Sequence, residues 1–246
     1  MKDYEKLLGC TRRAVENFKM ISEGDKIAVG ISGGKDSLVL TSALAGLRKI
    51  LPVKFEVYGI TLDLGFEGAD FSRISDYCES IDVPYTVVKT NISNVVFDIR
   101  QEKNPCALCA KMRRGALARE AAAIGCGKLA LGHHKDDVVD TFMLNLIHGG
   151  RLSTFEPVTY LSRSEITVIR PLIYMREYET RNFADKNSLP VAKSLCPADG
   201  GTERASMKET LDMLDLRHRG IRGQIFGAIE RSGIDGWHEC KRAKKE

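Results

Sequence analysis

Short hydrophobic runs alternate with amphipathic stretches along most of the chain. Runs of this length between turn residues are typical of strands that are buried on both faces of a parallel sheet. Apolar residues at helical spacing fill the stretches between them. We expect strands at 27–31, 55–62, 85–88 and 128–131, and helices at 3–22, 36–50, 70–81, 107–124 and 136–147. This order predicts an α/β fold with a doubly wound, mostly parallel sheet.

The C-terminal part follows a different pattern. Apolar runs at 157–161 and 166–170 predict a hairpin, and the chain is irregular from Leu189. Further helices are expected at 176–187, 203–216 and 221–231. The chain therefore divides into an N-terminal helix (1–23), a main α/β domain (24–175) and a small, mainly helical extension (176–246).

The composition is that of a folded protein. The 246 residues are 43% hydrophobic and 28% charged, which provides a core and argues against disorder. No run of about 18 apolar residues is present, so no membrane span is expected. The first 21 residues carry charges throughout and lack the apolar region of a signal peptide. A cytoplasmic location is therefore expected.

The net charge of +4 is only mildly basic. The basic residues gather in three clusters, namely Lys111, Arg113, Arg114 and Arg119, then Arg217, His218, Arg219 and Arg222, and finally Lys241, Arg242, Lys244 and Lys245. Such clusters bind RNA phosphates in some proteins and are solvated helix faces in others. Charge alone leaves both interpretations open.

A polar loop, which we call the phosphate loop, joins the first strand to the next helix. It reads Ser32-Gly33-Gly34-Lys35-Asp36-Ser37. Backbone N–H groups at such a helix start bind anions, and the two glycines let phosphate oxygens approach the backbone. The hydroxyls of Ser32 and Ser37 add donors. Asp36 is negatively charged like phosphate, so it is expected to act through a Mg²⁺ ion, and Lys35 would offset negative charge at the site.

A second polar segment, Gly132-His133-His134-Lys135-Asp136-Asp137, follows the fourth strand and opens a helix. Ligands of open α/β sheets bind at the carboxyl ends of strands, so this segment is expected to face the phosphate loop. Asp136 and Asp137 would then assist nucleotide or metal binding. Helix capping is the alternative for the two aspartates, and plain packing is the alternative for the histidines.

Three of the seven cysteines form a candidate metal or sulfur site. Cys106 and Cys109 open a helix, whose dipole, together with Arg113 and Arg114, is expected to favour thiolates. Cys196 is the credible third member, in an irregular segment. A redox pair, half a zinc site and an iron–sulfur site all remain open at this point. The other four are interpreted as structural, namely Cys10, Cys78, Cys126 and Cys240.

Taken together, the motifs resemble the tRNA 2-thiocytidine synthetase (TtcA) family of PP-loop ATP pyrophosphatases. The resemblance runs from about residue 24 to 230, and its motifs are Ser32–Ser37, Cys106-x-x-Cys109 with Arg113-Arg114-Gly115, Leu131–Asp137, Asn145 with Gly149-Gly150, Ile169–Leu172 and Leu195-Cys196. One departure is Ser194, which stands where many members have a further cysteine.

The resemblance implies an ATP- and Mg²⁺-dependent tRNA sulfurtransferase. It would adenylate the C2 oxygen of a tRNA pyrimidine, with cytidine 32 as the expected nucleotide, and would hold a 4Fe–4S cluster on three cysteines. Another PP-loop tRNA-modifying enzyme, for 2-thiouridine or lysidine, is one alternative, and a non-catalytic sensor is another. A cysteine desulfurase or other sulfur donor is the implied partner, and a homodimer stays open.

The resemblance and the motifs give four sets of candidate residues. The catalytic set is Lys35, Asp36 and Asp137, and the ATP-binding set is Ser32, Gly33, Gly34, Lys35, Asp36, Ser37, Gly132 and His133. The cluster ligands are Cys106, Cys109 and Cys196, with Asp36 and Asp136 for Mg²⁺. Arg113 and Arg114 are assigned to RNA.

Overall fold

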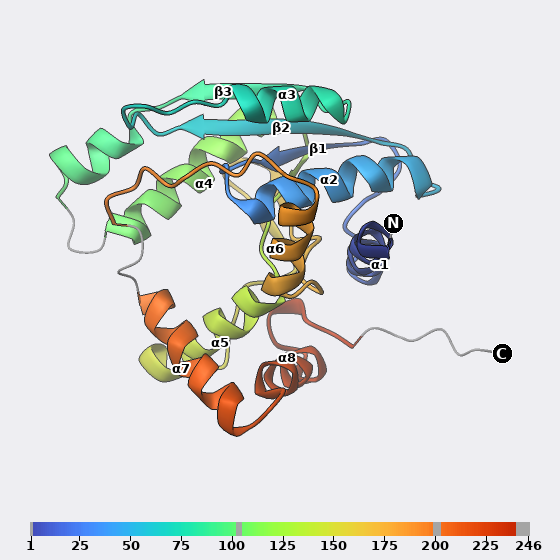
Figure 1. Cartoon of the computed structure of the whole chain (residues 1–246), viewed down its shortest axis with the longest axis vertical. Helices are drawn as coiled ribbons and strands as arrows, with labels where there is room; N and C mark the ends of the chain where they lie inside the picture. Colours follow the sequence, from blue (N-terminus) through green and yellow to red (C-terminus); the bar gives the residue numbers. More distant parts are fainter. Residues whose placement is uncertain (1, 102–104, 199–202, 240–246) are drawn as a thin grey trace.

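A single six-stranded sheet organises the chain (Figure 1). The computed structural model describes residues 2–101, 105–198 and 203–239. The strands are β1 (Asp25–Gly30), β2 (Phe55–Asp63), β3 (Tyr85–Lys89), β4 (Lys128–Ala130), β5 (Val158–Leu161) and β6 (Ile166–Ile169). Their order is β3-β2-β1-β4-β6-β5, and only β5 is antiparallel to its neighbour. The predicted α/β class, mostly parallel sheet and hairpin are confirmed.

Both faces of the sheet are buried because strand side chains alternate between two cores. On β1, Ile27 and Val29 belong to the core that includes α2, whereas Ala28 belongs to the core that includes α4. The helices of this part are α1 (Lys2–Asn17), α2 (Lys35–Ile50), α3 (Ser72–Ser80) and α4 (Pro105–Ala123). This continuous burial explains the apolar runs in the sequence.

The order of strands reverses between β1 and β4. From β1 the chain builds outward through β2 and β3, and then returns to place β4 on the other side of β1. The carboxyl ends of β1 and β4 lead directly into α2 and into α5 (Lys135–Gly149). Such a switch point opens a crevice between the two loops, which is where ligands of doubly wound sheets bind.

The C-terminal helices do not form a separate layer away from this crevice. They are α6 (Glu177–Lys186), α7 (Glu203–Arg217) and α8 (Ile221–Ser232), followed by a 3-10 turn, η2 (Ile234–Gly236). α6 packs on α2, while α7 and α8 pack on α5 (Figure 1). The part of the chain after residue 175 therefore contributes to the surroundings of the switch point.

Several local expectations were wrong. The first helix ends at Asn17 rather than residue 22, because Lys19 has a φ of +48° and Met20 turns into the core. A π-helix, η1 (Asn94–Ile99), was not expected. Arg222 is not on a basic surface but is buried in ion pairs with Asp140 and Asp212, at 2.8 and 2.7 Å.

Cys240 and the basic cluster at 241–245 lie outside the described residues. Within the part that is described, no helix is long and apolar enough to cross a membrane.

Candidate functional site

The phosphate loop holds its shape through its own hydroxyl groups. Ser37 Oγ donates to the Gly34 carbonyl (2.8 Å) and accepts from the Ser32 amide (3.2 Å), and Gly34 N–H donates to Ser32 Oγ (3.3 Å). Gly33 has a φ of +81°, which favours glycine. Gly34 is the N-cap of α2, and no described side chain caps this helix. The first N–H groups of α2 are therefore available to an anion.

Asp36 is held in place by a neighbour on α2 and by a residue of α6. Its Oδ1 accepts a hydrogen bond from Thr180 Oγ1 at 2.6 Å, and its Oδ2 lies 2.7 Å from Lys35 Nζ. The Nε2 atom of His134 lies 4.0 Å from the same Oδ2. The Asp36 side chain keeps 26% of its exposure, so the carboxylate is positioned and still accessible.

Lys35 points toward a second carboxylate at the start of α6. Glu177 lies 3.5 Å from Lys35 Nζ, 2.6 Å from Lys208 Nζ and 2.9 Å from Arg181. Burial alone would raise the pKa of Glu177, but these three cations outweigh it and lower the pKa to about 2. This network joins α2, α6 and α7 behind the phosphate loop.

The loop after β4 lies directly against the start of α2. A Cβ atom on Gly132 would lie 2.9 Å from the carbonyl carbon of Asp36 and 3.1 Å from the Ser37 nitrogen. Only glycine fits so close to another backbone without a shift. Gly132 therefore brings His133 next to the phosphate loop, as the sequence predicted.

The two aspartates that open α5 make protein contacts. Asp136 is buried and accepts from Arg176 Nε (3.1 Å) and from the Glu177 amide (2.7 Å), which ties α5 to α6. Asp137 forms a capping box with His134 and lies 3.5 Å from Arg204. These contacts favour structural roles, while the predicted catalytic and Mg²⁺ roles stay predictions.

A cleft of about 910 Å³ opens at the switch point. The predicted site residues that line it are Ser32, Gly34, Asp36, Ser37, Arg113, Gly132, His133 and Cys196. Those that do not line it are Gly33, Lys35, Cys106, Cys109, Arg114, Asp136 and Asp137. The end of β2 and the segment that follows it, between Leu62 and Phe71, also line the cleft, as does Arg204 of α7.

An irregular segment, residues 189–198, carries Cys196 along this cleft. The amide of Ala192 donates to the Gly33 carbonyl (2.9 Å), and residues 191–196 line the cleft. In Figure 1 the segment runs from α6 across α2 to the N-terminal end of α4. The bond from Ala192 therefore fastens the chain that carries the third cysteine to the phosphate loop.

The three predicted cysteines approach one another at the start of α4. Cys106 is exposed, and Cys109 and Cys196 are partly buried. Burial raises the pKa of Cys109, Arg113 partly offsets it, and thiolate charges on Cys196 and Cys106 would raise the pKa further. Burial of Cys109 therefore works against the thiolate that Arg113 favours, and the thiolate stays a prediction. No three His, Cys, Asp or Glu side chains among the described residues are grouped to hold a single metal ion.

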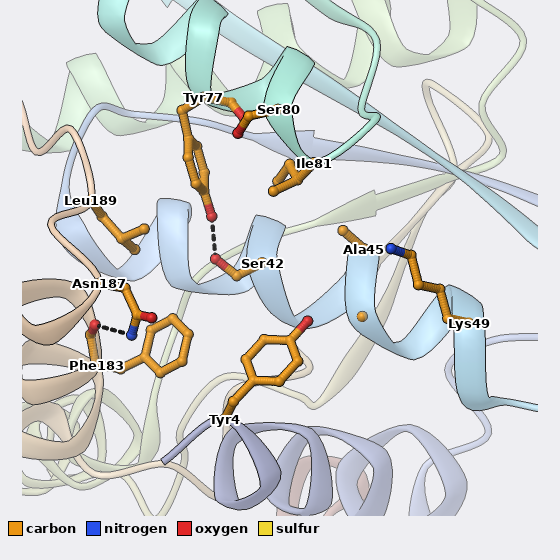
Figure 2. Close-up of a pocket in the computed structure, with 11 residues that line it drawn as sticks. Tyr4, Ser42, Ala45, Lys49, Tyr77, Ser80, Ile81, Phe183, Asn187 and Leu189 are labelled. Atoms are coloured by element: carbon orange, nitrogen blue, oxygen red, sulfur yellow. Dashed lines mark hydrogen bonds between the residues drawn. The ribbon is translucent and has the colours of Figure 1, made fainter. Parts of the chain in front are cut away.

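A smaller cavity of about 310 Å³ lies between α1, α2, α3 and α6 (Figure 2). The Tyr77 and Ser42 hydroxyls hydrogen-bond to each other, and Asn187 donates to the Phe183 carbonyl at 2.8 Å. None of the predicted site residues lines this cavity. The switch-point cleft is therefore the candidate site.

Sequence reasoning missed three residues that shape the cleft. Thr180 and Glu177 come from α6, and Ala192 comes from the irregular segment. They carry no motif of their own. The available signal was that an irregular segment with a cysteine follows a helix, which does not indicate what the segment contacts.

Comparison with known proteins identifies the class of this site. The PP-loop domain profile matches residues 9–210, so the chain is a PP-loop protein. The tRNA-cytidine(32) 2-sulfurtransferase of Geobacter sulfurreducens is 37% identical over 232 residues, which are 92% of this chain and 89% of that protein. The enzyme of the same name from Vibrio cholerae is 35% identical over 222 residues, 89% and 72% of the two chains. The chain belongs to this family of tRNA-cytidine(32) 2-sulfurtransferases.

A solved structure is similar over nearly the whole chain. It is the U34-tRNA thiolase NcsA from Methanococcus maripaludis with its [4Fe-4S] cluster, which is 26% identical with a TM-score of 0.76. The match covers 98% of this chain and 85% of that one. The family and the fold expected from the motifs are thus confirmed.

Proposed function

We propose that the protein thiolates cytidine 32 of tRNA at the expense of ATP. The observation that carries the proposal is that the phosphate loop and Cys196 line one cleft, and that Ala192 joins their two segments. A nucleotide-binding surface and a sulfur-handling residue are then within reach of one substrate. The names of the relatives support the choice of tRNA and of cytidine 32.

In the first step, the C2 oxygen of cytidine attacks the α-phosphate of ATP and pyrophosphate leaves. The free N–H groups of α2 and the hydroxyls of Ser32 and Ser37 would bind the phosphates. Asp36, accessible at the cleft, would bind them through Mg²⁺. Adenylation turns the oxygen into part of a good leaving group, AMP, which a sulfur nucleophile can replace.

The products of ATP cleavage test this assignment. With tRNA present, the protein is expected to form AMP and pyrophosphate, and Asp36→Ala is expected to abolish this cleavage without unfolding the protein. A metal ion at phosphoryl groups typically stabilises the transition state by several kcal/mol. Formation of ADP and phosphate by the wild-type protein would contradict the proposal.

Cys106, Cys109 and Cys196 are suited to hold a 4Fe–4S cluster. Cys196 lines the cleft, and Cys109 interacts electrostatically with both Cys196 and Cys106. Thiolates are the usual ligands of such clusters. When bound by three cysteines, a cluster supplies one iron without a protein ligand, where sulfide can be held. The [4Fe-4S] cluster of the NcsA thiolase supports the same choice.

Metal analysis of anaerobically purified protein tests the ligands. Changing Cys106, Cys109 or Cys196 to Ala is expected to remove iron and sulfide while ATP binding remains. Cys78→Ala and Cys126→Ala serve as controls, because both thiols are buried and burial raises their pKa values to about 11. Stoichiometric zinc without iron in an active protein would contradict the cluster.

The RNA would approach along α4. Arg113 lines the cleft, and Arg114 is exposed beside it. A loop base in single-stranded RNA can enter such a cleft without a duplex being opened. The cysteine desulfurase or other sulfur donor, a homodimer and a cytoplasmic location remain predictions.

A further inference from the structure

The motif places His133 in the expected ATP-binding set, but it does not say which atom of the ring would bind. His133 directly follows Gly132, whose close contact with Asp36 and Ser37 fixes the loop against the start of α2. The residue lines the cleft together with the phosphate loop. Its neighbour His134 has a clear structural role as the N-cap of α5, whereas His133 has none.

The two ring nitrogens of His133 have different surroundings. Nδ1 is buried and has no hydrogen-bond partner among the described residues. Nε2 also lacks a partner there, but it is not buried. Because the residue lines the cleft, the exposed Nε2 edge of the ring faces the cleft and the Nδ1 edge faces the protein.

Arg170 is the neighbour of His133 on the buried side of the ring. Both side chains pack on Phe155, with ring centroids 4.9 Å apart for His133 and the guanidinium carbon of Arg170 5.0 Å from the Phe155 centroid. Arg170 Nη1 donates to the Glu156 carbonyl and to Thr159, but its Nε is buried without a partner in the described chain.

An arginine Nε–H can only donate a hydrogen bond. The Nδ1 of His133 is the other buried side-chain atom without a partner in the described chain, and it can accept this hydrogen bond through one buried water. In a neutral imidazole one nitrogen accepts and the other carries the proton. An accepting Nδ1 therefore places the proton on Nε2, on the side of the cleft.

The charges around the ring keep it neutral. Burial is the largest effect that lowers the pKa of His133, followed by the positive charges of Arg170 and Arg204, and the pKa falls to about 3. The ring can therefore offer a hydrogen bond without adding a full charge to the site.

We propose that His133 is a fixed, neutral hydrogen-bond donor whose Nε2–H contacts a phosphate oxygen of the bound nucleotide. This inference rests on the proposed function, because it assumes that the cleft binds ATP. Donors that are oriented before the reaction stabilise developing charge without reorganisation. Arg170, which acts through His133, is the positioning residue.

Nitrogen-15 NMR of histidine-labelled protein tests the tautomer directly. The His133 signals, assigned by their loss in His133→Gln, are expected to report a proton on Nε2 and none on Nδ1 at neutral pH. The Nε2–H signal is expected to shift when AMP or pyrophosphate is added, and the two ligands show which phosphate is contacted. A proton on Nδ1, a charged ring, or a signal that moves with neither ligand nor with ATP would overturn the inference.

Two isosteric variants test the same point by affinity. The amide nitrogen of glutamine reaches the position of Nε2, whereas that of asparagine reaches only the position of Nδ1. His133→Gln is expected to bind ATP within about threefold of the wild-type affinity. His133→Asn is expected to bind it about ten- to a hundredfold more weakly, the loss of one hydrogen bond to a charged group. His148→Ala, at an exposed histidine of α5, is the control and should match the wild type.

Failure of the proposed function and failure of the role of His133 give different results. If the wild-type protein binds no nucleotide, the proposed function itself fails. If it binds ATP and His133→Asn binds equally well, only the role of His133 fails. Thermal unfolding of each variant shows whether it is folded, and the NMR measurement needs no variant beyond the assignment.

Discussion

Thr180 places a hydroxyl from α6 on the carboxylate that is proposed to bind Mg²⁺, and removing that hydroxyl gives a specific prediction. Thr180 is fully buried, and its Oγ1 lies 2.6 Å from Asp36 Oδ1. Thr180→Val replaces the hydroxyl with a methyl group of similar size. The change therefore removes, with little change in volume, the hydroxyl proton that Asp36 Oδ1 and the Glu177 carbonyl oxygen (2.9 Å) can both accept.

The expected loss of stability follows from the exposure of Asp36. A hydrogen bond to a charged group contributes about 1.5–3 kcal/mol. Because the Asp36 side chain keeps 26% of its exposure, water replaces part of the bond, and we expect a loss of about 1–2 kcal/mol. For a chain of this size the Tm would fall by roughly 2–8 °C.

The affinity for Mg-ATP is expected to fall as well. Without the Thr180 hydroxyl, Asp36 must be ordered when the metal binds, which costs about 0.5–1.5 kcal/mol, or roughly a two- to tenfold weaker Kd. Calorimetric titration with Mg²⁺ and a non-hydrolysable ATP analogue measures this effect.

Thr11→Val is the matched control, since Thr11 is equally buried and, among the described residues, its hydroxyl bonds only to the Leu7 carbonyl within α1 (2.8 Å). It should leave the Mg-ATP affinity unchanged. If Thr180→Val also leaves that affinity unchanged, the α6 contact does not position Asp36 and the reasoning is refuted.

Three further changes are expected to have measurable effects. Gly132→Ala puts a Cβ 2.9 Å from the backbone of α2 and should weaken ATP binding more than tenfold, whereas Gly127→Ala, with no described atom within 4 Å of its Cβ, should not. Arg113→Ala should reduce the slope of the logarithm of the tRNA-binding constant against the logarithm of salt concentration by about 0.7. Arg119→Ala, about two turns further along α4, is the comparison. If both variants have the same slope, Arg113 does not bind RNA and its role is beside Cys109. The pKa of Glu177 is lowered from 4.5 to about 2, so this carboxylate stabilises the fold fully above pH 4.5 and loses its effect as the pH falls toward 2. The Tm of Glu177→Gln should therefore decline less over that range than the wild-type Tm, and parallel declines would contradict the assignment.

The sequence predicted the features that depend on neighbouring residues. The strands at 27–31 and 128–131 were recognisable because both faces of the sheet are buried. The phosphate loop was recognisable because two glycines, two hydroxyls and a helix start follow one strand in direct succession. The meeting of this loop with Gly132 followed from the rule that parallel strands end at the same edge.

The sequence could not predict contacts between distant segments. Thr180 lies 144 residues from Asp36 in the chain, and no local pattern relates the two. The same holds for Ala192 and Gly33. The buried pairing of Arg222 was misread because an arginine in a basic stretch looks the same whether it faces solvent or Asp140. Such contacts depend on the packing of α6 and α8, which the residue pattern does not specify.

The tRNA product provides the most direct test of the account. Anaerobically purified protein would be incubated with unmodified tRNA, Mg-ATP and sulfide, and the nucleosides and nuclease fragments of the tRNA would be analysed by mass spectrometry. We expect 2-thiocytidine at position 32, formed only with ATP and absent with Cys196→Ala. Thiolation of uridine 34 instead, or 2-thiocytidine formed equally well by Cys196→Ala, would contradict the proposed function.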